Sequence, residues 1–287
     1  MAENESATVV ITGASTGIGA ACAAGLDRLG WRVFAGVRRM EDGEQLRLRC
    51  STRLTPVPLD VTDAHSIAAA TAFVQSSVGP AGLAGLVNNA GIAVAGPLEA
   101  VPLAGWRRQL EVNVLGPVAV TQTFLPLLRA GRGRIVNMGS IAGRAAMPLM
   151  GPYSASKYAL EAITDALRLE LLPWGIRVAI IEPGAIATPI WDKSGRDAAA
   201  LEASVPPETA RLYADAAASV RRAVDKAARR AIAPDAVVEA VVHALTAPRP
   251  KSRYLVGWDA KVRALMATLL PVRLADKLLV AVLNLPH

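Results

Sequence analysis

Short runs of β-branched and aliphatic residues alternate along the chain with longer stretches in which apolar positions recur at helical spacing. Repeated strand–helix units place their strands side by side, so the pattern predicts an α/β fold with a doubly wound parallel sheet covered by helices on both faces. The predicted strands are Thr8–Ile11, Arg32–Val37, Leu54–Pro58, Leu83–Asn88, Arg134–Asn137, Arg177–Ile181 and Tyr254–Val256. The helices are predicted to begin near Gly17, Glu41, Asp63, Pro102, Tyr153 and Pro234. A ligand crevice is expected beyond the carboxyl ends of the strands.

Two segments depart from this rhythm. Ile190–Ala233 is Ala-rich, helical in pattern and broken by Pro206 and Pro207, which predicts a mobile flap of one or two helices over the crevice. From Trp258 to the end, apolar residues recur at helical spacing in two runs, each shorter than the roughly 18 to 20 residues of a membrane span. We therefore predict a single catalytic domain over residues 7–257 and a C-terminal helical extension over residues 258–287.

Composition fits a compact globular chain, with 52% hydrophobic and 19% charged residues. The formal net charge of +7 is spread over helices that also carry acids, without a nucleic-acid-binding motif, so no nucleic-acid partner is predicted. The histidines His65, His243 and His287 lie too far apart for metal-ligand spacing, and no metal site is predicted.

The cysteines and the N-terminus bear on the compartment. Cys22 and Cys50 are too few for the disulfide framework of a secreted domain, and two free thiols indicate reducing surroundings. Residues 1–7 are polar and acidic, unlike a signal peptide. The predicted location is the cytoplasm.

A glycine-rich turn follows the first strand and opens a helix. Gly13, Gly17 and Gly19 have the T-G-x-x-x-G-x-G spacing, which allows close backbone approach to a pyrophosphate, while the helix N-terminus attracts negative charge. The candidate phosphate-binding residues are Thr12, Gly13, Ser15, Thr16, Gly17, Ile18 and Gly19. The alternative is a turn without a ligand.

The end of the second strand bears on cofactor choice. An NAD-preferring fold usually has an acid there for the ribose 2′-hydroxyl, whereas this strand ends in Gly36-Val37-Arg38-Arg39. A guanidinium can pair with a 2′-phosphate, so NADP(H) is predicted, with Arg38 as its ligand. The alternative is that both arginines are surface charges and that NAD(H) is also accepted.

Tyr153 and Lys157 are four residues apart in a helical pattern, so their side chains share one face. A tyrosine with a pKa near about 10 is a poor base at neutral pH, and a neighbouring ammonium group favours its phenolate. The pair therefore predicts acid/base chemistry by Tyr153, although Y-x-x-x-K alone is common on protein surfaces.

Taken together, several motifs between Thr8 and Thr188 resemble the short-chain dehydrogenase/reductase family, which has a Rossmann fold. They are the glycine turn, Asp60-Val61, Asn88-Asn89-Ala90-Gly91, Asn113 within Val112-Asn113-Val114, Ser140, Tyr153-x-x-x-Lys157, and Pro183-Gly184 with Thr188. The run Val33–Arg38 is similar to the NADP-preferring hydroxysteroid and retinol dehydrogenase branches.

The resemblance implies a catalytic tetrad of Asn113, Ser140, Tyr153 and Lys157. Ser140 would hold the substrate oxygen beside Tyr153, Lys157 would also bind the nicotinamide ribose, and Asn113 would hold a water connecting Lys157 to solvent. The other implied cofactor ligands are Asp60 and Val61 at the adenine, Asn89, Ala90 and Gly91 at the ribose, and Pro183, Gly184, Ile186 and Thr188 at the nicotinamide. The family also implies a homodimer or homotetramer.

The predicted function is NADP(H)-dependent oxidoreduction. Hydride passes between the nicotinamide and a hydrophobic ketone or secondary alcohol, with a pocket formed by Ala142–Pro152 and Ile190–Ala233, including Trp191. The alternative is a cofactor-sensing or scaffolding protein on the same fold. Acyl transfer by Ser140 is disfavoured because no Gly-x-Ser-x-Gly elbow surrounds it.

The C-terminal helices carry Arg263, Arg273 and Lys277 beside their apolar positions. We expect these helices to be buried against the core or a neighbouring subunit, and the alternative is peripheral membrane contact.

Overall fold

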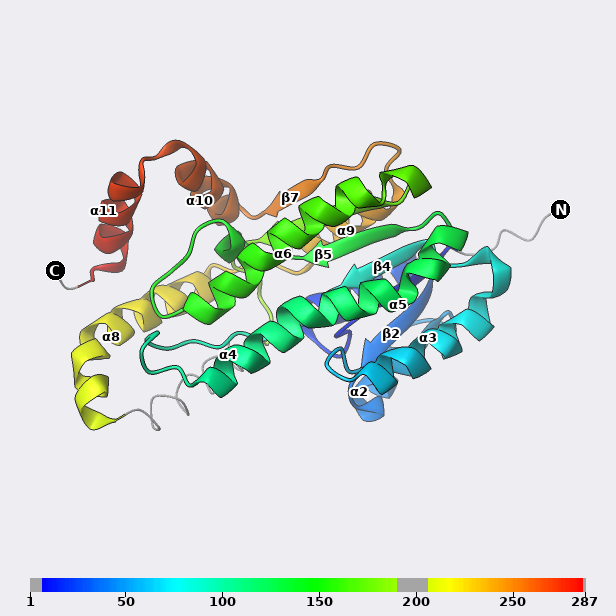
Figure 1. The fold of residues 1–287 in the computed structure, drawn as a ribbon, viewed down its shortest axis with the longest axis horizontal. Coiled ribbons are helices and arrows are strands. Elements are labelled where there is room, and N and C mark those ends of the chain that lie inside the picture. The colour runs from blue at the N-terminus through cyan, green and yellow to red at the C-terminus, as the bar shows by residue number, and fades with distance from the viewer. Residues whose placement is uncertain (1–6, 190–205, 286–287) are drawn as a thin grey trace.

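The computed structural model describes residues 7–189 and 206–285, and a parallel sheet of seven strands forms their centre (Figure 1). The strands are β1 (Thr8–Ile11), β2 (Arg32–Val37), β3 (Leu54–Pro58), β4 (Gly85–Asn88), β5 (Arg134–Met138), β6 (Arg177–Pro183) and β7 (Arg253–Val256). Their order in the sheet is β3-β2-β1-β4-β5-β6-β7. The predicted doubly wound parallel sheet is confirmed, and its order reverses between β1 and β4, where such folds bind ligands.

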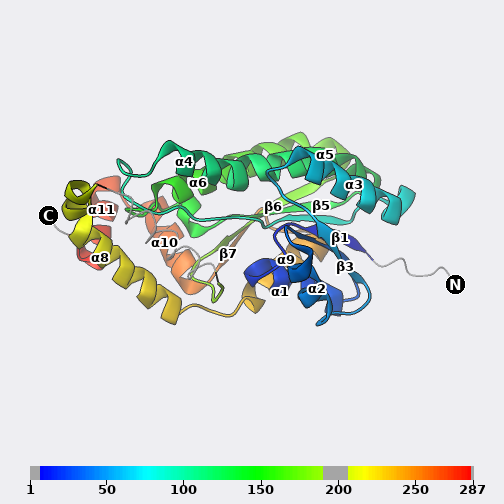
Figure 2. The ribbon, with the colours of Figure 1, turned by 90° about the horizontal axis from the view of Figure 1, so that it is seen from below.

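Helices cover both faces of the sheet (Figure 2). They are α1 (Gly17–Arg28), α2 (Met40–Arg47), α3 (Ala64–Val78), α4 (Leu103–Leu110), α5 (Gly116–Ala130), α6 (Gly151–Glu170), α8 (Pro207–Arg229), α9 (Asp235–Thr246), α10 (Trp258–Leu269) and α11 (Val272–Leu283). Helices α1, α2 and α9 lie on one face and α3, α4, α5 and α6 on the other, whereas α8, α10 and α11 extend beyond one end of the sheet (Figures 1 and 2).

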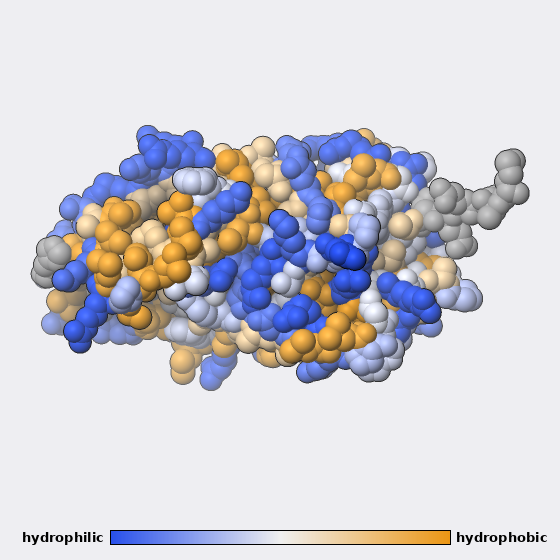
Figure 3. All heavy atoms as spheres, turned by 90° about the horizontal axis from the view of Figure 1, so that it is seen from above, coloured by the Kyte–Doolittle hydropathy of each residue, from blue (hydrophilic) through white to orange (hydrophobic). Residues whose placement is uncertain are grey.

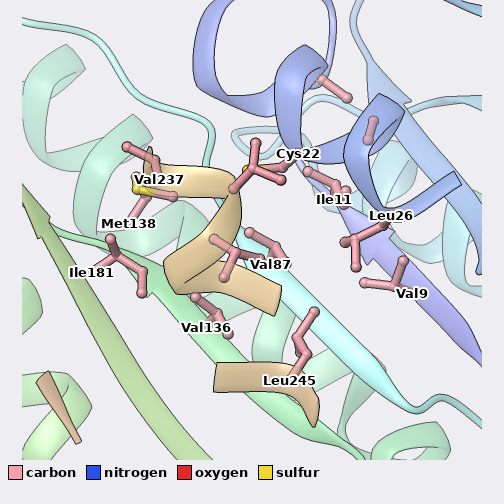
Figure 4. Close-up of a cluster of buried hydrophobic side chains, with 14 of the residues drawn as sticks. Val9, Ile11, Cys22, Leu26, Val87, Val136, Met138, Ile181, Val237 and Leu245 are labelled. Atoms are coloured by element: carbon pink, nitrogen blue, oxygen red, sulfur yellow. The ribbon is translucent and has the colours of Figure 1, made fainter. Parts of the chain in front are cut away.

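Alternating side chains of the strands build a separate core on each face. Val9 and Ile11 of β1 pack with Leu26 of α1 and residues of α9 (Figure 4), whereas Val10 between them belongs to the opposite cluster with Phe124 of α5. Each fully buried aliphatic or aromatic side chain of this kind contributes about 1.5–3 kcal/mol of transfer free energy. Burial on both faces explains why the strands are continuous apolar runs in the sequence.

Several predicted bounds shift by one or two residues, for local reasons. Helix α3 begins one residue after the predicted Asp63 because the Asp63 carboxylate accepts the His65 N–H at 2.9 Å and caps the helix. Strand β4 begins at Gly85 rather than Leu83, because the Leu83 N–H donates to the carbonyl oxygen of Leu127 at the end of α5. The helix expected near Tyr153 begins at Gly151.

Helix α5 was missing from the prediction. The segment after Pro102 forms α4, then a π-helical turn over Glu111–Leu115, and then continues as α5. Such π turns are short insertions within helical segments and are frequent at functional sites. The turn carries Asn113, one of the predicted tetrad residues.

The C-terminal extension predicted over residues 258–287 forms α10 and α11 in its described part. Ala260 and Ala264 of α10 are buried against Ile141, in the 3₁₀ turn Ile141–Gly143 after β5. The Ser219 hydroxyl of α8 donates to the carbonyl oxygen of Asn284 at 3.0 Å and so joins α8 to the end of α11. Of the flap predicted over 190–233, residues 190–205 lie outside the described residues. None of the helices described is both long enough and apolar enough to span a membrane.

Candidate active site

A cleft of about 1900 Å³ lies at the carboxyl ends of the strands. One part is lined by the turns that follow β1, β2, β3 and β4, and we call this the cofactor end. The other part is lined by α8, α10 and α11, and we call this the helical end. The volume exceeds the roughly 300–1,000 Å³ of a typical small-ligand pocket, so the cleft has room for a dinucleotide and a second molecule.

Most of the predicted site residues meet in the wall of this cleft, although they come from positions far apart in the chain. Those in the wall are Gly13, Ser15, Thr16, Gly17, Ile18, Gly19, Arg38, Asp60, Val61, Asn89, Ala90, Gly91, Ser140, Tyr153, Lys157, Pro183, Gly184, Ile186 and Thr188. Thr12 and Asn113 do not line the cleft; both side chains are buried beside it.

The glycine turn is held by hydrogen bonds to the turn after β4. The buried Thr12 hydroxyl accepts the backbone N–H groups of Asn89 and Ala90, each at 3.0 Å, and the Asn89 side chain donates to the carbonyl oxygens of Thr12 and Gly13. A Cβ on Gly13, where φ is +64°, would lie 2.8 Å from the Ala90 Cα. The two turns are thus fixed to each other, and Thr12 acts from beneath them rather than as a wall residue.

The two arginines after β2 have different surroundings. Arg39 makes a two-pronged ion pair with Asp42, with Nε and Nη2 each 3.0 Å from a carboxylate oxygen. Arg38 lines the cleft and has no ion pair with a described residue. Arg38 is therefore the guanidinium that could bind an anion at the cofactor end.

Asp60 and Val61 follow β3 and line the same end. The Asp60 Oδ1 accepts both the N–H and the hydroxyl of Thr62, at 2.9 and 2.8 Å, and the Asp60 N–H donates to Ser66. These bonds fix the loop that presents Asp60 and Val61 to the cleft, so these residues could hold a flat base there.

Tyr153, Ser140 and Lys157 converge near the middle of the cleft. Tyr153 lies in the first turn of α6, and Ser140 follows β5; their side chains share a hydrogen bond. Lys157 is buried one turn after Tyr153, and its Nζ donates to the carbonyl oxygen of Met138 at 2.7 Å and lies 5.7 Å from the Tyr153 ring centre. The Lys157 ammonium thus ties α6 to β5 and fixes the tyrosine relative to the serine.

Asn113 supports this group from behind. Its side-chain amide accepts from the N–H of Ile92 at 2.9 Å and donates to the carbonyl oxygen of Ile92 and to the Ser156 hydroxyl. Ser156 in turn donates to the carbonyl oxygen of Tyr153 at 2.7 Å. Asn113 therefore connects the π-helical turn to the backbone of the catalytic helix, and its predicted role in holding a water stays a prediction.

Burial sets the pKa values of the two titrating groups. It raises the pKa of Tyr153 above the usual value, while the hydrogen bond from Ser140 and the positive charge of Arg263 oppose that rise. Burial lowers the pKa of Lys157 to about 8, and the negative charge of Glu161 opposes that fall. The predicted lowering of the Tyr153 pKa by Lys157 stays a prediction.

A buried charged cluster lies one helical turn beyond Lys157. Glu161 of α6 and Glu182 of β6 are both buried, and burial together with the charge of Glu182 raises the pKa of Glu161 to about 7. Arg253 bridges Glu161, Asp165 and Glu182, with its Nη2 2.6 Å from the Asp165 carboxylate. Sequence reasoning missed this cluster, although a glutamate inside the apolar strand Arg177–Pro183 could have signalled it.

Arg263 of α10 was also missed as a site residue. Sequence reasoning grouped it with the basic residues of an interfacial helix, but the structure places it in the wall of the cleft, half-buried, where its charge acts on Tyr153. No local motif indicates this position, because Arg263 and Tyr153 are 110 positions apart in the chain.

Comparison with known proteins agrees with this geometry. A model of the family described as short chain dehydrogenase matches residues 7–199. The chain belongs to this family. It is an oxidoreductase of the short-chain dehydrogenase type, acting between CH–OH and C=O groups.

Among its relatives, retinol dehydrogenase 5 of Mus musculus is 38% identical over 98% of this chain and 90% of its own length. The 17-beta-hydroxysteroid dehydrogenase type 6 of Bos taurus is 40% identical over 94% of this chain and 87% of its own length. The predicted similarity to retinol and hydroxysteroid dehydrogenases is therefore confirmed.

Solved structures give the same fold with either cofactor. A short chain dehydrogenase from Burkholderia cenocepacia in complex with NADP has a TM-score of 0.73 and 29% identity, covering 98% of this chain and 99% of its own. A short chain dehydrogenase/reductase from Burkholderia phymatum in complex with NAD has a TM-score of 0.76 and 25% identity, covering 93% and 94%. Members of this fold thus bind NADP or NAD.

Proposed function

We propose that this protein is an NADP(H)-dependent oxidoreductase that interconverts a hydrophobic ketone and its secondary alcohol, with Tyr153 as the acid/base. The observation that carries the proposal is the convergence of Ser140, Tyr153 and Lys157 in one cleft with the glycine turn. A protein that only senses or stores a cofactor has no need for this group of side chains.

The residues of the cleft can perform the proton half of this reaction. A bound NADPH supplies the hydride that adds to the carbonyl carbon. Tyr153 donates its phenolic proton to the carbonyl oxygen, and the Ser140 hydroxyl stabilises the negative charge that develops on that oxygen. In the oxidative direction Tyr153 takes the proton of the alcohol. The Lys157 ammonium favours the phenolate that Tyr153 then holds, because the two groups carry opposite charges.

The cofactor end fits a dinucleotide with a 2′-phosphate. Gly13 and Gly17 have positive φ angles and leave the turn free of side chains where a pyrophosphate would approach, at the N-terminus of α1. Arg38 lines the cleft without an ion-pair partner among the described residues, and the strand β2 ends without an acid. This arrangement supports NADP(H) over NAD(H) because a guanidinium pairs with phosphate and an acid would repel it.

The helical end supports an apolar substrate. The walls contributed by the loop after β5 and by α8, α10 and α11 include Met147, Val220, Val224, Met266 and Leu279. Retinol and hydroxysteroid dehydrogenases among the relatives carry names that denote lipid-like substrates. We therefore propose a retinoid-like, steroid-like or other lipid-like carbonyl or alcohol.

The experiment that tests this proposal measures NADPH and NADH oxidation by the purified protein over aliphatic, aromatic, steroid and retinoid carbonyls. Turnover of apolar carbonyls that requires NADPH supports the proposal. Tight NADPH binding without turnover of any carbonyl, and without oxidation of the corresponding alcohols by NADP⁺, would favour a cofactor-sensing protein.

The outer surface of α10 and α11 carries exposed apolar residues that a partner could cover. Figure 3 shows apolar residues gathered over this end. Leu265 and Leu269 of α10 are 60% and 67% exposed and lie outside the cleft wall. We propose that this surface meets a second subunit of a cytoplasmic homo-oligomer. Recovery of the protein in a salt-washable membrane fraction instead would support peripheral membrane contact.

A further inference from the structure

Arg263 brings a second cation close to the catalytic tyrosine, from a part of the chain outside the family's motifs. Its Nη2 donates to the carbonyl oxygen of Ala145 at 2.8 Å, and Ala145 follows the 3₁₀ turn that Ser140 caps. The guanidinium lines the cleft, and its positive charge opposes the rise in the pKa of Tyr153 that burial causes. Arg263 therefore lies where the catalytic residues meet the helical end.

Arg263 has no ion-pair partner among the described residues. No carboxylate of residues 7–189 or 206–285 lies within salt-bridge distance of it, and the acid that acts on it from farther away is Asp259, one turn earlier. Asp259 already accepts the N–H of Ala185 at 2.8 Å. Burial lowers the pKa of Arg263, which means that its surroundings disfavour the positive charge. A guanidinium nevertheless stays protonated in proteins, so the charge remains.

The walls next to Arg263 are mostly apolar, and the other charged residues described in them are paired or exposed. Arg144 also lines the cleft, but it is paired with the buried Glu182 at 3.5 Å. Arg221, Asp225 and Asp276 of α8 and α11 line the cleft as exposed residues. The side chains that continue from Arg263 toward the helical end are apolar; they include Val220, Val224, Met266, Leu279 and Val282.

We propose that Arg263 is a specificity-determining residue that binds a carboxylate of the substrate, so that preferred substrates are hydroxy acids and oxo acids with a long apolar body. A carboxylate offers the guanidinium two parallel charge-assisted hydrogen bonds. Because the charge of Arg263 acts on Tyr153, the carboxylate and the reacting carbon lie at the same end of the substrate. The apolar body then extends between α8, α10 and α11.

This inference rests on the proposed function, because the carboxylate is placed relative to the carbon that reacts. A hydroxy acid would lose a hydride from its carbinol carbon to NADP⁺ and the hydroxyl proton to Tyr153, giving the oxo acid, NADPH and a proton released to solvent. The acid group itself is unchanged in the reaction.

The first test compares a long-chain 3-hydroxy acid with its methyl ester, with NADP⁺, in the wild type, Arg263→Met and Lys261→Met. Lys261 is an exposed cation on the same helix and lies outside the cleft wall, so it controls for loss of charge. We expect KM for the acid to be roughly 10- to 100-fold lower than KM for the ester in the wild type and in Lys261→Met, as for a hydrogen-bonded charge pair. In Arg263→Met the two KM values should converge because KM for the acid rises, and this holds even if the lost charge near Tyr153 changes kcat for both substrates.

Two results would overturn the inference. One is a wild type that does not distinguish acid from ester. The other is an Arg263→Met variant that lowers kcat for acid and ester by the same factor and keeps the wild-type ratio of the two KM values, which would mean that Arg263 only adjusts the pKa of Tyr153.

A binding test separates this inference from the proposed reaction. Dodecanoate, below its micelle concentration, should raise the melting temperature of the NADP⁺-saturated wild type and of Lys261→Met more than methyl dodecanoate does, and Arg263→Met should lose this difference. If this pattern holds while no hydroxy acid is oxidised, the carboxylate site stands and the proposed reaction fails. Equal stabilisation of wild type and Arg263→Met by dodecanoate would contradict the site.

Discussion

The two ends of the cleft are built from different parts of the polypeptide. At the cofactor end the wall includes two backbone turns, which are held together by the bonds that join Thr12 and Gly13 to Asn89 and Ala90. At the helical end the wall includes side chains of α8, α10 and α11, among them Arg263, whose charge acts on Tyr153. A backbone wall can bind one fixed ligand through N–H groups, whereas a side-chain wall can change its ligand by substitution. The cofactor end should therefore be intolerant of added atoms, and the helical end should set the substrate.

The largest effect is expected at Gly19. A Cβ there would fall on the Asn89 side-chain nitrogen and the carbonyl oxygen of Gly13, so Gly19→Ala must displace the turn. We expect more than about 100-fold weaker NADPH binding, measured by titration calorimetry, and a loss of roughly 1–3 kcal/mol in unfolding free energy from overpacking.

Gly30→Ala is the matched control for this variant. Gly30 has φ +87° and no atom within 4 Å of an added Cβ, so alanine there costs stability through backbone strain alone. Normal NADPH binding by Gly19→Ala would show that the cofactor end tolerates an added side chain, which contradicts the expected difference between the two ends of the cleft.

A smaller effect is expected at the two arginines after β2. Arg38→Ala should weaken NADPH binding by about 10- to 100-fold and leave NADH binding unchanged, because it removes a charged hydrogen-bond partner of the 2′-phosphate. Arg39→Ala should change neither, since Arg39 is paired with Asp42. Fluorescence titration with both cofactors measures this, and equal NADPH affinity in the wild type and Arg38→Ala would remove the basis for the NADP(H) preference.

The smallest effect concerns the buried cluster that Glu161 forms beneath the catalytic residues. Its pKa is raised from 4.5 to about 7, so the folded protein holds this proton more tightly than the unfolded chain does. Ionisation of Glu161 therefore lowers the stability of the fold, and this loss grows from about pH 4.5 to about pH 7 and is constant above. The fall in melting temperature between about pH 5 and about pH 8 should be a few degrees smaller in Glu161→Gln than in the wild type.

Asp165→Asn controls for the loss of a partner of Arg253. The hydrogen bond from Arg253 lowers the pKa of Asp165, so its stabilising contribution is fully present above the unfolded pKa and is lost only as the pH falls below that value. This variant should melt at a lower temperature than the wild type by the same amount at both pH values. An unchanged pH dependence in Glu161→Gln would show that Glu161 is ionised in the folded protein at both pH values.

The features that the sequence could predict are those set by short, contiguous stretches of the chain. Strands β1, β2 and β3 have the predicted bounds because each is an apolar run bounded by turn residues, and the glycine turn is a contiguous motif. The convergence of Ser140, Tyr153 and Lys157 was predictable because two are one helical turn apart and the third follows a strand of the same sheet edge.

The rest depends on contacts between distant segments. The charge of Arg263 acts on Tyr153 because α10 packs on the turn after β5. The ion pairs of the Glu161 cluster join residues of α6, β6 and β7. The π-helical turn between α4 and α5 places Asn113 beside Ile92, and neither propensity nor periodicity indicates it. Such features are set by tertiary packing, so local patterns place Arg263 on an interfacial helix and do not show that Asn113 is buried behind the catalytic residues.

The role of Tyr153 as proton donor is tested most directly by the turnover of Tyr153→Phe with NADPH and a carbonyl that the wild type reduces. This change removes one hydroxyl that bonds Ser140 and leaves the glycine turn and Lys157 in place. We predict unchanged NADPH affinity and a loss of turnover of about 10²- to 10⁴-fold, the usual contribution of a general acid. A variant that reduces the carbonyl at close to the wild-type rate would contradict Tyr153 as the proton donor, and with it the proposed mechanism.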